Sequence, residues 1–278
     1  MNELLLSELQ SDDKDLLQTL VLLEEYILNA GTENIAKHLA DETDLDTLEY
    51  IITACQDTLA ELEKPLDKAE LLINELYFRH LFVDISSKDQ AWSLSSFKLS
   101  ESLNFRIMSP IIKAAFIIEI MQACGFESDI VFVPNKIMIR MICDDSYAII
   151  FDPITGESIH WHELDLRMSD LDGDPSQHEL YTMDKQVLLV EHINAFKSVL
   201  IQEKQFAKAL RCVDLLLSLN PDDPLQRRDR GYLLHQLDCF KVAVDDYRYF
   251  VEQCPKDPAA QLLKMQLEHI NLNEPILH

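Results

Sequence analysis

Two short proline-containing segments near the C-terminus are separated by 34 residues, and this spacing limits the fold more than any other feature of the chain. NPDDP occupies residues 220–224 and CPKDP residues 254–258. A repeat of this length is typical of stacked helix–turn–helix units, in which each unit buries its apolar face against the next one. The C-terminal third of the chain is therefore predicted to be an array of paired helices.

The residues around the two prolines fit the tetratricopeptide repeat. When the prolines are aligned, Ala209 and Ala243 fall at the small position where the two helices of a unit cross. Gly231 falls where the first helix of the second unit needs a small residue. Lys197 stands at the same position of the first unit, which is thus less regular. The segment PAAQLLKMQLEHI predicts a helix that covers the open face of the last repeat.

A buried helix and a pair of antiparallel strands are predicted in the middle of the chain. RIMSPIIKAAFIIEIMQACG has Ser109 as N-cap, Pro110 at the first helical position and Gly125 as the stop signal. The strands VFVPNKIMIRMI and YAIIFDP follow and are joined by a short acidic turn. Lys136 lies in the first strand and Asp152 ends the second, so we expect the hairpin to carry these polar side chains to a site.

Residues 1–82 are predicted to be helical. DDKDLLQTLVLLEEYILNAG ends at Gly31, LDTLEYIITACQDTLAELEK follows, and PLDKAELLINELYFRHLF opens with Pro65 at a first-turn position. Apolar residues recur at helical spacing in the last of these segments. The region shows no cluster of chemistry-bearing side chains.

The chain is strongly acidic, with 49 Asp and Glu against 24 Lys and Arg in 278 residues. A net charge of −25 disfavours nonspecific binding to nucleic acid, although residues 184–270 hold half of the bases. No apolar run is long enough to span a membrane, and the acidic N-terminus is unlike a signal peptide. Six cysteines without a CxxC pair suit reduced thiols, so we expect a cytoplasmic protein.

The order of these parts resembles that of the YchA-type bacterial proteins, which join a transglutaminase-like domain to tetratricopeptide repeats. The resemblance is closest in RRDRGYLLHQLDCFKVAVDDYRYFVEQCPKDP and in the terminal PILH, and it is clear in VFVPNKIMIRM and FDPITGES. It implies an orthologue, in a related proteobacterium, of the protein that gives the family its name. It also implies an α+β, mainly helical fold: a helical segment at residues 1–82, a transglutaminase-like (papain-like) core at 83–180 and repeats at 184–278.

The resemblance also states what catalysis would need. Transglutaminase-like enzymes use a cysteine at the start of a buried helix, a histidine on the next strand and an aspartate one strand further on. The matching helix starts at Ser109 and has no cysteine in its first turn. Many relatives carry PGHF where this chain has PNKI, which places Lys136 at the histidine position. Only the acid remains, as Asp152, so the resemblance implies a pseudoenzyme.

Other nucleophiles fit the site poorly. Cys124 lies at the far end of the helix and Cys143 follows the first strand, so both are expected to be small buried side chains. Ser109 with Lys136 as base and Asp152 behind it would form a dyad for a cryptic hydrolase or acyltransferase, which is the alternative function. Asp152 would, however, stabilise the charged form of the lysine, and Ser109 is occupied as an N-cap. We therefore expect Lys136 and Asp152 to form a salt bridge, or to be polar residues of a lost site.

Metal and cofactor signals are weak. His160 and His162 form an HxH pair, but no third ligand has a recognisable spacing, although His178 is near in sequence. We expect exposed imidazoles in a turn and no metal. The five glycines form no Gly-rich phosphate loop, so no cofactor is expected.

Arg227, Arg228 and Arg230 lie in QRRDRGY, on the first helix of the second repeat. Positions 227 and 230 usually carry bulky apolar residues in this repeat, so arginines there need partners. One interpretation is internal pairing, with Asp222, Asp223 or acids of the transglutaminase-like core. The other is a basic groove that binds an acidic group or a C-terminal carboxylate of a protein partner.

Together these features predict a non-catalytic protein–protein interaction or regulatory scaffold, in which the repeats bind a protein or peptide partner. Direct binding to nucleic acid is not expected, because the chain has no basic stripe, and membrane binding is not expected either. The resemblance implies a regulator of the kind associated with transcription or virulence.

Overall fold

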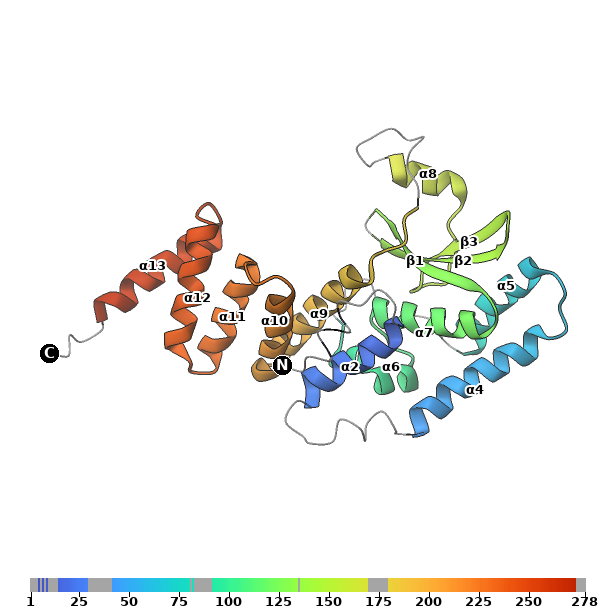
Figure 1. Ribbon diagram of the computed structural model, residues 1–278, viewed down its shortest axis with the longest axis horizontal. Helices are drawn as coiled ribbons and strands as arrows, with labels where there is room; N and C mark the ends of the chain where they lie inside the picture. The colour runs from blue at the N-terminus through green and yellow to red at the C-terminus, as the bar shows by residue number, and fades with distance from the viewer. Residues whose placement is uncertain are drawn as a thin grey trace. The chain divides into compact units, whose positions relative to one another are not determined.

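The computed structural model describes most of the chain: residues 5, 7, 9, 15–29, 42–80, 82, 92–134, 136–169 and 180–273, with the side chains of 42–45, 169 and 268–273 excepted. The described residues form two compact units, each with its own helices (Figure 1). The first unit takes the described residues up to 25 and from 42 to 189, and the second takes 26–29 and 190–273. The predicted division of the chain at residues 82 and 180 stays a prediction.

The predicted N-terminal helices are present as α2 (Leu16–Asn29), α4 (Glu42–Leu59) and α5 (Pro65–Asn74). Pro65 opens α5 as predicted. The helix continues directly into a π-helical turn, η1 (Glu75–Arg79). The buried residues of α4 recur every three to four positions, which is the helical period that turns one face toward the core: Leu48, Ile51, Cys55 and Leu59.

The buried central helix begins and ends as predicted. After η2 (Leu94–Phe97) and α6 (Leu99–Phe105), helix α7 (Pro110–Ala123) starts with Ser109 at the N-cap position. Gly125 follows the helix with φ +86°, a left-handed conformation that glycine adopts without a steric penalty. Nearly every side chain in the first two turns of α7 is buried, so the helix forms the centre of the first unit.

The sheet has three antiparallel strands in the order β1 (Glu127–Val133), β2 (Lys136–Asp144) and β3 (Tyr147–Phe151). The prediction of VFVPNKIMIRMI as one strand was wrong, because Pro134 lies in a turn and Val133 pairs with Lys136. Proline has no N–H for a sheet ladder, which favours this break at Pro134. The acidic turn between β2 and β3 is confirmed.

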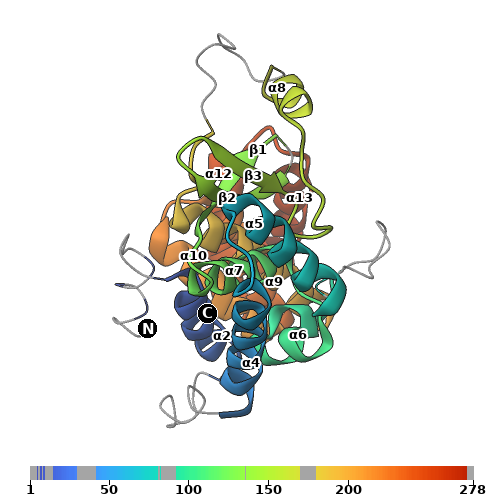
Figure 2. The ribbon, with the colours of Figure 1, turned by 90° about the vertical axis from the view of Figure 1, so that its right-hand side faces the viewer.

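The sheet is covered on both faces. On one face, Val131, Met138 and Ile150 pack against Leu164 and Met168 of α8 (Trp161–Ser169). On the other face the strands contact α5 and α7, and Figure 2 shows α8 and these two helices on opposite sides of the sheet. A sheet buried on both faces supports the predicted α+β, mainly helical fold.

The second unit is a helical array, as the 34-residue spacing predicts. It contains α10 (Phe206–Leu219), α11 (Pro224–Gln236), α12 (Phe240–Gln253), α13 (Pro258–Asn273) and most of α9 (Lys185–Gln202). Ala209 and Ala243 are fully buried. A Cβ on Gly231 would lie 2.8 Å from ring carbons of Tyr247, so a small residue is required there. No helix among the described residues is long and apolar enough to cross a membrane.

Candidate functional site

Lys136 and Asp152 form a salt bridge in the first unit. Lys136 begins β2 and Asp152 directly follows β3, so the pairing of these two strands brings their side chains together. The Lys136 Nζ donates to Asp152 Oδ2 at 2.7 Å. The other carboxylate oxygen accepts the backbone N–H of Ile154 at 2.8 Å. The predicted salt bridge is confirmed, and both oxygens of the carboxylate are occupied.

The loop after Asp152 packs on Tyr77 of η1. The Tyr77 hydroxyl donates to the carbonyl oxygen of Pro153 at 2.6 Å. Gly156 has φ +76°, and a Cβ there would lie 2.7 Å from the Tyr77 ring, so the backbone approaches the ring as only glycine permits. Burial, together with the charge of Asp152, raises the pKa of Tyr77. The phenol therefore stays protonated and serves as a structural donor.

Sequence reasoning missed Lys113 as part of this region. Lys113 lies on α7 with 1% of its surface exposed, and its ammonium donates to the carbonyl oxygen of Ile154 at 3.1 Å. It also lies 5.9 Å from the centroid of the Tyr77 ring. The available signal was a single lysine in an otherwise apolar helix. A buried ammonium needs acceptors, and the loop supplies one of them.

Ser109 occupies the N-cap position of α7, but its side chain does not cap the helix. Its backbone N–H donates to Ser96 and its carbonyl accepts from Lys113. The hydroxyl is buried, with 2% of the residue exposed, and has no hydrogen-bond partner among the residues that the structure describes. The prediction of a capping hydroxyl was therefore wrong. Within the described chain the Ser109 hydroxyl makes no bond to Lys136, and the dyad stays an untested alternative.

The two cysteines near this region have unreactive thiols. Burial raises the pKa of Cys124 to about 11, and burial is also the main cause that raises the pKa of Cys143. A thiol becomes nucleophilic as its thiolate, so both remain protonated at neutral pH. This supports the prediction that they are packing residues.

The HxH pair stands at the start of α8, where both imidazoles are exposed. Among the residues that the structure describes, no group of three or more His, Cys, Asp or Glu side chains is placed to hold a metal ion. His178 lies outside the described residues, so the expectation of no metal stays a prediction.

In the second unit, Arg230 and Arg227 share the carboxylate of Asp246. Arg230 makes two hydrogen bonds to it, both at 2.6 Å, which is the fork-like geometry that guanidinium favours. Arg227 contacts the same carboxylate at 3.4 Å and lies 5.1 Å from the ring centroid of Tyr249. The carboxylate is 2% exposed. The internal partner is therefore Asp246, on α12, and not the predicted Asp222 or Asp223.

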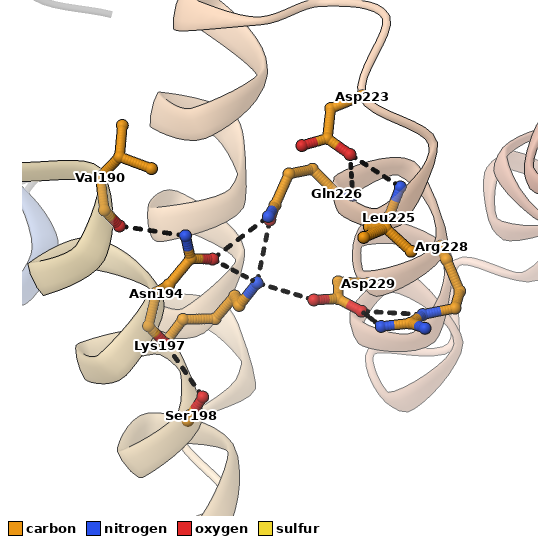
Figure 3. Close-up of polar contacts among 9 residues, drawn as sticks. All are labelled: Val190, Asn194, Lys197, Ser198, Asp223, Leu225, Gln226, Arg228 and Asp229. Atoms are coloured by element: carbon orange, nitrogen blue, oxygen red, sulfur yellow. Dashed lines mark hydrogen bonds and ion pairs between the residues drawn. The ribbon is translucent and has the colours of Figure 1, made fainter. Parts of the chain in front are cut away.

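Arg228 points to a different carboxylate and is the most exposed of the three arginines. Its Nε and Nη2 donate to Asp229 Oδ1 at 3.1 and 2.8 Å, and its side chain is 35% exposed. Asp229 is shared with a second cation, because its other oxygen accepts from the Lys197 ammonium at 2.7 Å (Figure 3). The single negative charge of Asp229 thus offsets only one of the two positive charges on Arg228 and Lys197.

Lys197 is the centre of a buried network between α9 and α11 (Figure 3). Its ammonium donates to Asn194 at 3.0 Å, to Gln226 at 2.9 Å and to Asp229 at 2.7 Å. The three N–H bonds of an ammonium are therefore all satisfied, which allows the residue to be 5% exposed. Lys197 departs from the repeat pattern in the sequence of the first repeat, and in the structure it joins the first repeat to the second.

Comparison with known proteins identifies the family. Residues 42–206, more than half of the chain, match the family model described as "Transglutaminase-like superfamily". The chain belongs to the transglutaminase-like superfamily. In this member of the superfamily, residues 196–268 match the family model described as "Tetratricopeptide repeat", which confirms the predicted combination of domains.

Its relatives in the superfamily are bacterial. The chain is 28% identical over 265 residues to "UPF0162 protein YchA" of Escherichia coli (strain K12), covering 92% of this chain and 95% of that one. It is 27% identical over 240 residues to "Protein SirB1" of Salmonella typhimurium, covering 84% and 87%. A "UPF0162 protein" of Vibrio cholerae is 31% identical over 165 residues, which span 58% of this chain and 61% of that relative.

These matches make the chain a YchA-type protein, while the expected orthology stays a prediction. No solved structure matches the chain.

Proposed function

We propose that this YchA-type protein is a protein–protein interaction or regulatory scaffold, whose tetratricopeptide repeats bind an acidic segment of a protein partner. The observation that carries the proposal is the shared carboxylate of Asp229. Arg228 uses two of its five guanidinium N–H groups on Asp229, and its side chain remains partly exposed. The remaining donors can bind a carboxylate of the partner, because Asp229 is also bound by Lys197.

The three arginines differ in what they can do for a partner. Arg230 is fixed to a buried carboxylate by two bonds, and Arg227 contacts the same group. Their substitution would leave Asp246 buried without its counter-charge and would disturb folding. Arg228 is paired with Asp229 on its own helix and lies 5.5 Å from the ring centroid of Phe250. Asp229 also has Lys197, so changing the charge of Arg228 leaves no buried carboxylate without a counter-charge.

We also propose that the transglutaminase-like unit is not catalytic. By the resemblance, the helix start that includes Ser109 lacks the expected cysteine, and Lys136 stands at the histidine position. A serine nucleophile must reach both its substrate and a base, whereas Ser109 is buried and Lys136 is bound to Asp152. A cytoplasmic location is part of the same proposal, supported by the pattern of unpaired cysteines.

The interaction proposal is tested with Arg228→Glu and a matched control, Arg248→Glu, which makes the same charge change on α12. Tagged wild-type protein and both variants are expressed in a relative's bacterial host, crosslinked and purified, and the copurifying proteins are quantified. We expect Arg228→Glu to lose at least one specific partner that wild type and Arg248→Glu retain. Far-UV circular dichroism verifies that both variants are folded. Identical partner sets for all three proteins would contradict the proposal.

The proposal on catalysis has a separate test. Native and urea-unfolded protein are treated with a serine-directed fluorophosphonate and a cysteine-directed iodoacetamide, and the intact mass is measured. We expect no adduct that is specific to the native state. An adduct on Ser109 that forms only in the native protein and is lost in Ser109→Ala would establish the dyad chemistry with Lys136 instead, whatever the repeats bind.

A further inference from the structure

The end of η1 and the end of α6 meet at His80 and Arg106 in the first unit. Arg106 Nε donates to the carbonyl oxygen of His80 at 2.9 Å, and its guanidinium lies 5.7 Å from the ring centroid of Phe82. Arg106 has φ 60° and ψ 21°, a left-handed conformation that is uncommon outside glycine. His80 follows a π-helical turn. Left-handed residues other than glycine and π-helical turns are both concentrated at functional sites.

Both side chains hold a buried nitrogen without a partner. Arg106 Nη1 and His80 Nε2 are out of contact with solvent and make no hydrogen bond within the part of the chain that the structure describes. His80 as a whole is 9% exposed. Native proteins seldom leave buried polar groups unpaired. Two such groups on contacting residues therefore indicate an acceptor that the described residues of this unit do not provide.

Arg106 is also an exception among the arginines of its unit. The other three that the structure describes there are each paired with a carboxylate: Arg79 with Glu75, Arg140 with Asp129 and Arg167 with Glu163. Residues 1–189 contain 36 acids and only 13 bases, so carboxylates are abundant in this part of the sequence. Burial is the cause that lowers the pKa of Arg106, and within the described part of this unit it forms no salt bridge. An arginine that has no carboxylate partner among these described residues is available to bind a carboxylate of another molecule.

Exposed apolar residues flank the pair along the chain. Phe78 is 76% exposed and Phe105 is 65% exposed, and each lies within two residues of His80 or Arg106. Aromatic residues and arginine are the types that contribute most to protein interfaces, because they combine a large contact area with directional donors. The flanking residues therefore suit a protein ligand better than a free ion.

We infer that His80 and Arg106 bind a carboxylate presented by a protein partner, with Phe78 and Phe105 contacting apolar residues beside it. A carboxylate has two oxygens, so one can accept from Arg106 Nη1 and the other from the imidazole N–H of His80. Arg106 is only partly buried, so binding of this carboxylate requires a rotation of the side chain that exposes its buried nitrogen. This surface lies in the transglutaminase-like unit and goes beyond the proposed role of the repeats.

The probe for a first test is N-acetyl-L-phenylalanine, which joins a carboxylate to an aromatic ring, and the control ligand is N-acetyl-L-phenylalaninamide. Both are titrated into full-length ¹⁵N-labelled protein, and the side-chain signals of His80 and Arg106 are followed by NMR. We expect the acid, but not the amide, to shift both signals. Arg106→Gln should weaken binding of the acid by about tenfold or more, because a charge-assisted bond is lost. Arg167→Gln, which removes a paired arginine of the same unit, should leave binding unchanged.

Three outcomes would overturn the inference. One is an equal response to acid and amide, and another is unchanged affinity in Arg106→Gln. The third concerns Asp84 and Asp89, which lie outside the described residues but close to His80 in sequence. If the acid binds the double variant Asp84→Asn/Asp89→Asn but not the wild-type protein, the carboxylate that accepts from Arg106 and His80 belongs to the chain itself. Because the probe binds the wild-type protein directly, the first comparison holds even if a variant fails to fold. None of these results depends on Arg228, so they leave the proposal for the repeats untouched.

Discussion

Two lysine–aspartate pairs, one in each unit, have the same bond length and different surroundings. Lys136 and Asp152 are 2.7 Å apart, as are Lys197 and Asp229. The Lys136 side chain is 45% exposed, whereas that of Lys197 is 7% exposed and has two further acceptors. Exposed ion pairs contribute little to stability because water and salt screen them, whereas a buried charge depends on every partner it has. A short distance alone therefore does not tell which pair the fold needs.

The two pairs also differ in what remains when the lysine is removed. Lys136 stands at the position where the resemblance expects a histidine, and its partner Asp152 would keep its bond from Ile154 without it. Lys197 stands where the repeat prefers a small residue, and two helices are joined through it. The first pair therefore joins the ends of two strands and is half exposed, while the second pair is part of a buried network that holds two helices of the repeat array together.

The largest effect is expected for Lys197→Met. Methionine keeps much of the volume but leaves the oxygen of Gln226 without its donor and removes one of the two cations bound to Asp229, so the free energy of unfolding should fall by about 3 kcal/mol. Both tryptophans, at 92 and 161, belong to the first unit. Urea unfolding followed by circular dichroism should therefore show the loss, while tryptophan fluorescence should not. The exposed Lys241→Met is the control. A neutral or stabilising result would show that the repeats do not need the buried charge.

A second effect comes from pH and again concerns the repeats. Burial lowers the pKa of His192 to about 4 from its usual 6.5. Between these values the unfolded chain binds a proton that the folded repeats do not, so the free energy of unfolding falls as the pH falls. The expected loss by pH 5 is about 2 kcal/mol. Urea midpoints measured by circular dichroism from pH 7 to 5 report it, and His192→Gln should flatten the slope. An equal slope in the variant would assign the pH dependence to other groups.

A third test compares glycines of the two units. Alanine at Gly231 would place its Cβ 2.8 Å from the Tyr247 ring and 3.1 Å from the Ala243 carbonyl, so we expect a loss of about 2 kcal/mol from overpacking. Gly125 has nothing within 4 Å but has φ +86°, so alanine there should cost about 1 kcal/mol through backbone strain alone. Urea unfolding measures both. Replacing the ring with a smaller side chain in Tyr247→Leu should restore the stability that Gly231→Ala loses. If the effects of the two substitutions simply add, crowding is not the cause of the loss.

Features with a local cause could be predicted from sequence. Pro110 at the start of α7 and Gly125 at its end each follow from backbone chemistry within a few residues, and the 34-residue spacing marks a periodic unit that is visible directly in the sequence; all three are confirmed. The break at Pro134 was also within reach, because a residue without an N–H is rare inside a sheet. The apolar residues on either side of it concealed the turn.

Features that depend on packing could not be predicted. Arg230 was expected to find a nearby acid, but its partner Asp246 lies 16 residues away and is brought close only when α11 packs on α12. The acceptor of Lys113 lies 41 residues away, on a loop that its own sequence does not mark. The Ser109 hydroxyl is buried and does not cap its helix, so the sequence could place the residue at the helix start without fixing its hydrogen bonds.

The smallest effect is expected for Lys136→Met, and it decides whether the two lysine–aspartate pairs really differ. The pair is partly exposed, so its loss should cost about 0.5 kcal/mol, and the difference from wild type should shrink in about 0.5 M sodium chloride. Tryptophan fluorescence during urea unfolding measures this unit. Asp152 keeps the N–H of Ile154 in the variant, so no carboxylate is left without a donor. A cost as large as that of Lys197→Met, unaffected by salt, would mean that Lys136 is held in a closed site in solution. That result would return it to consideration as a base for Ser109, because only a desolvated lysine can lose its proton near neutral pH.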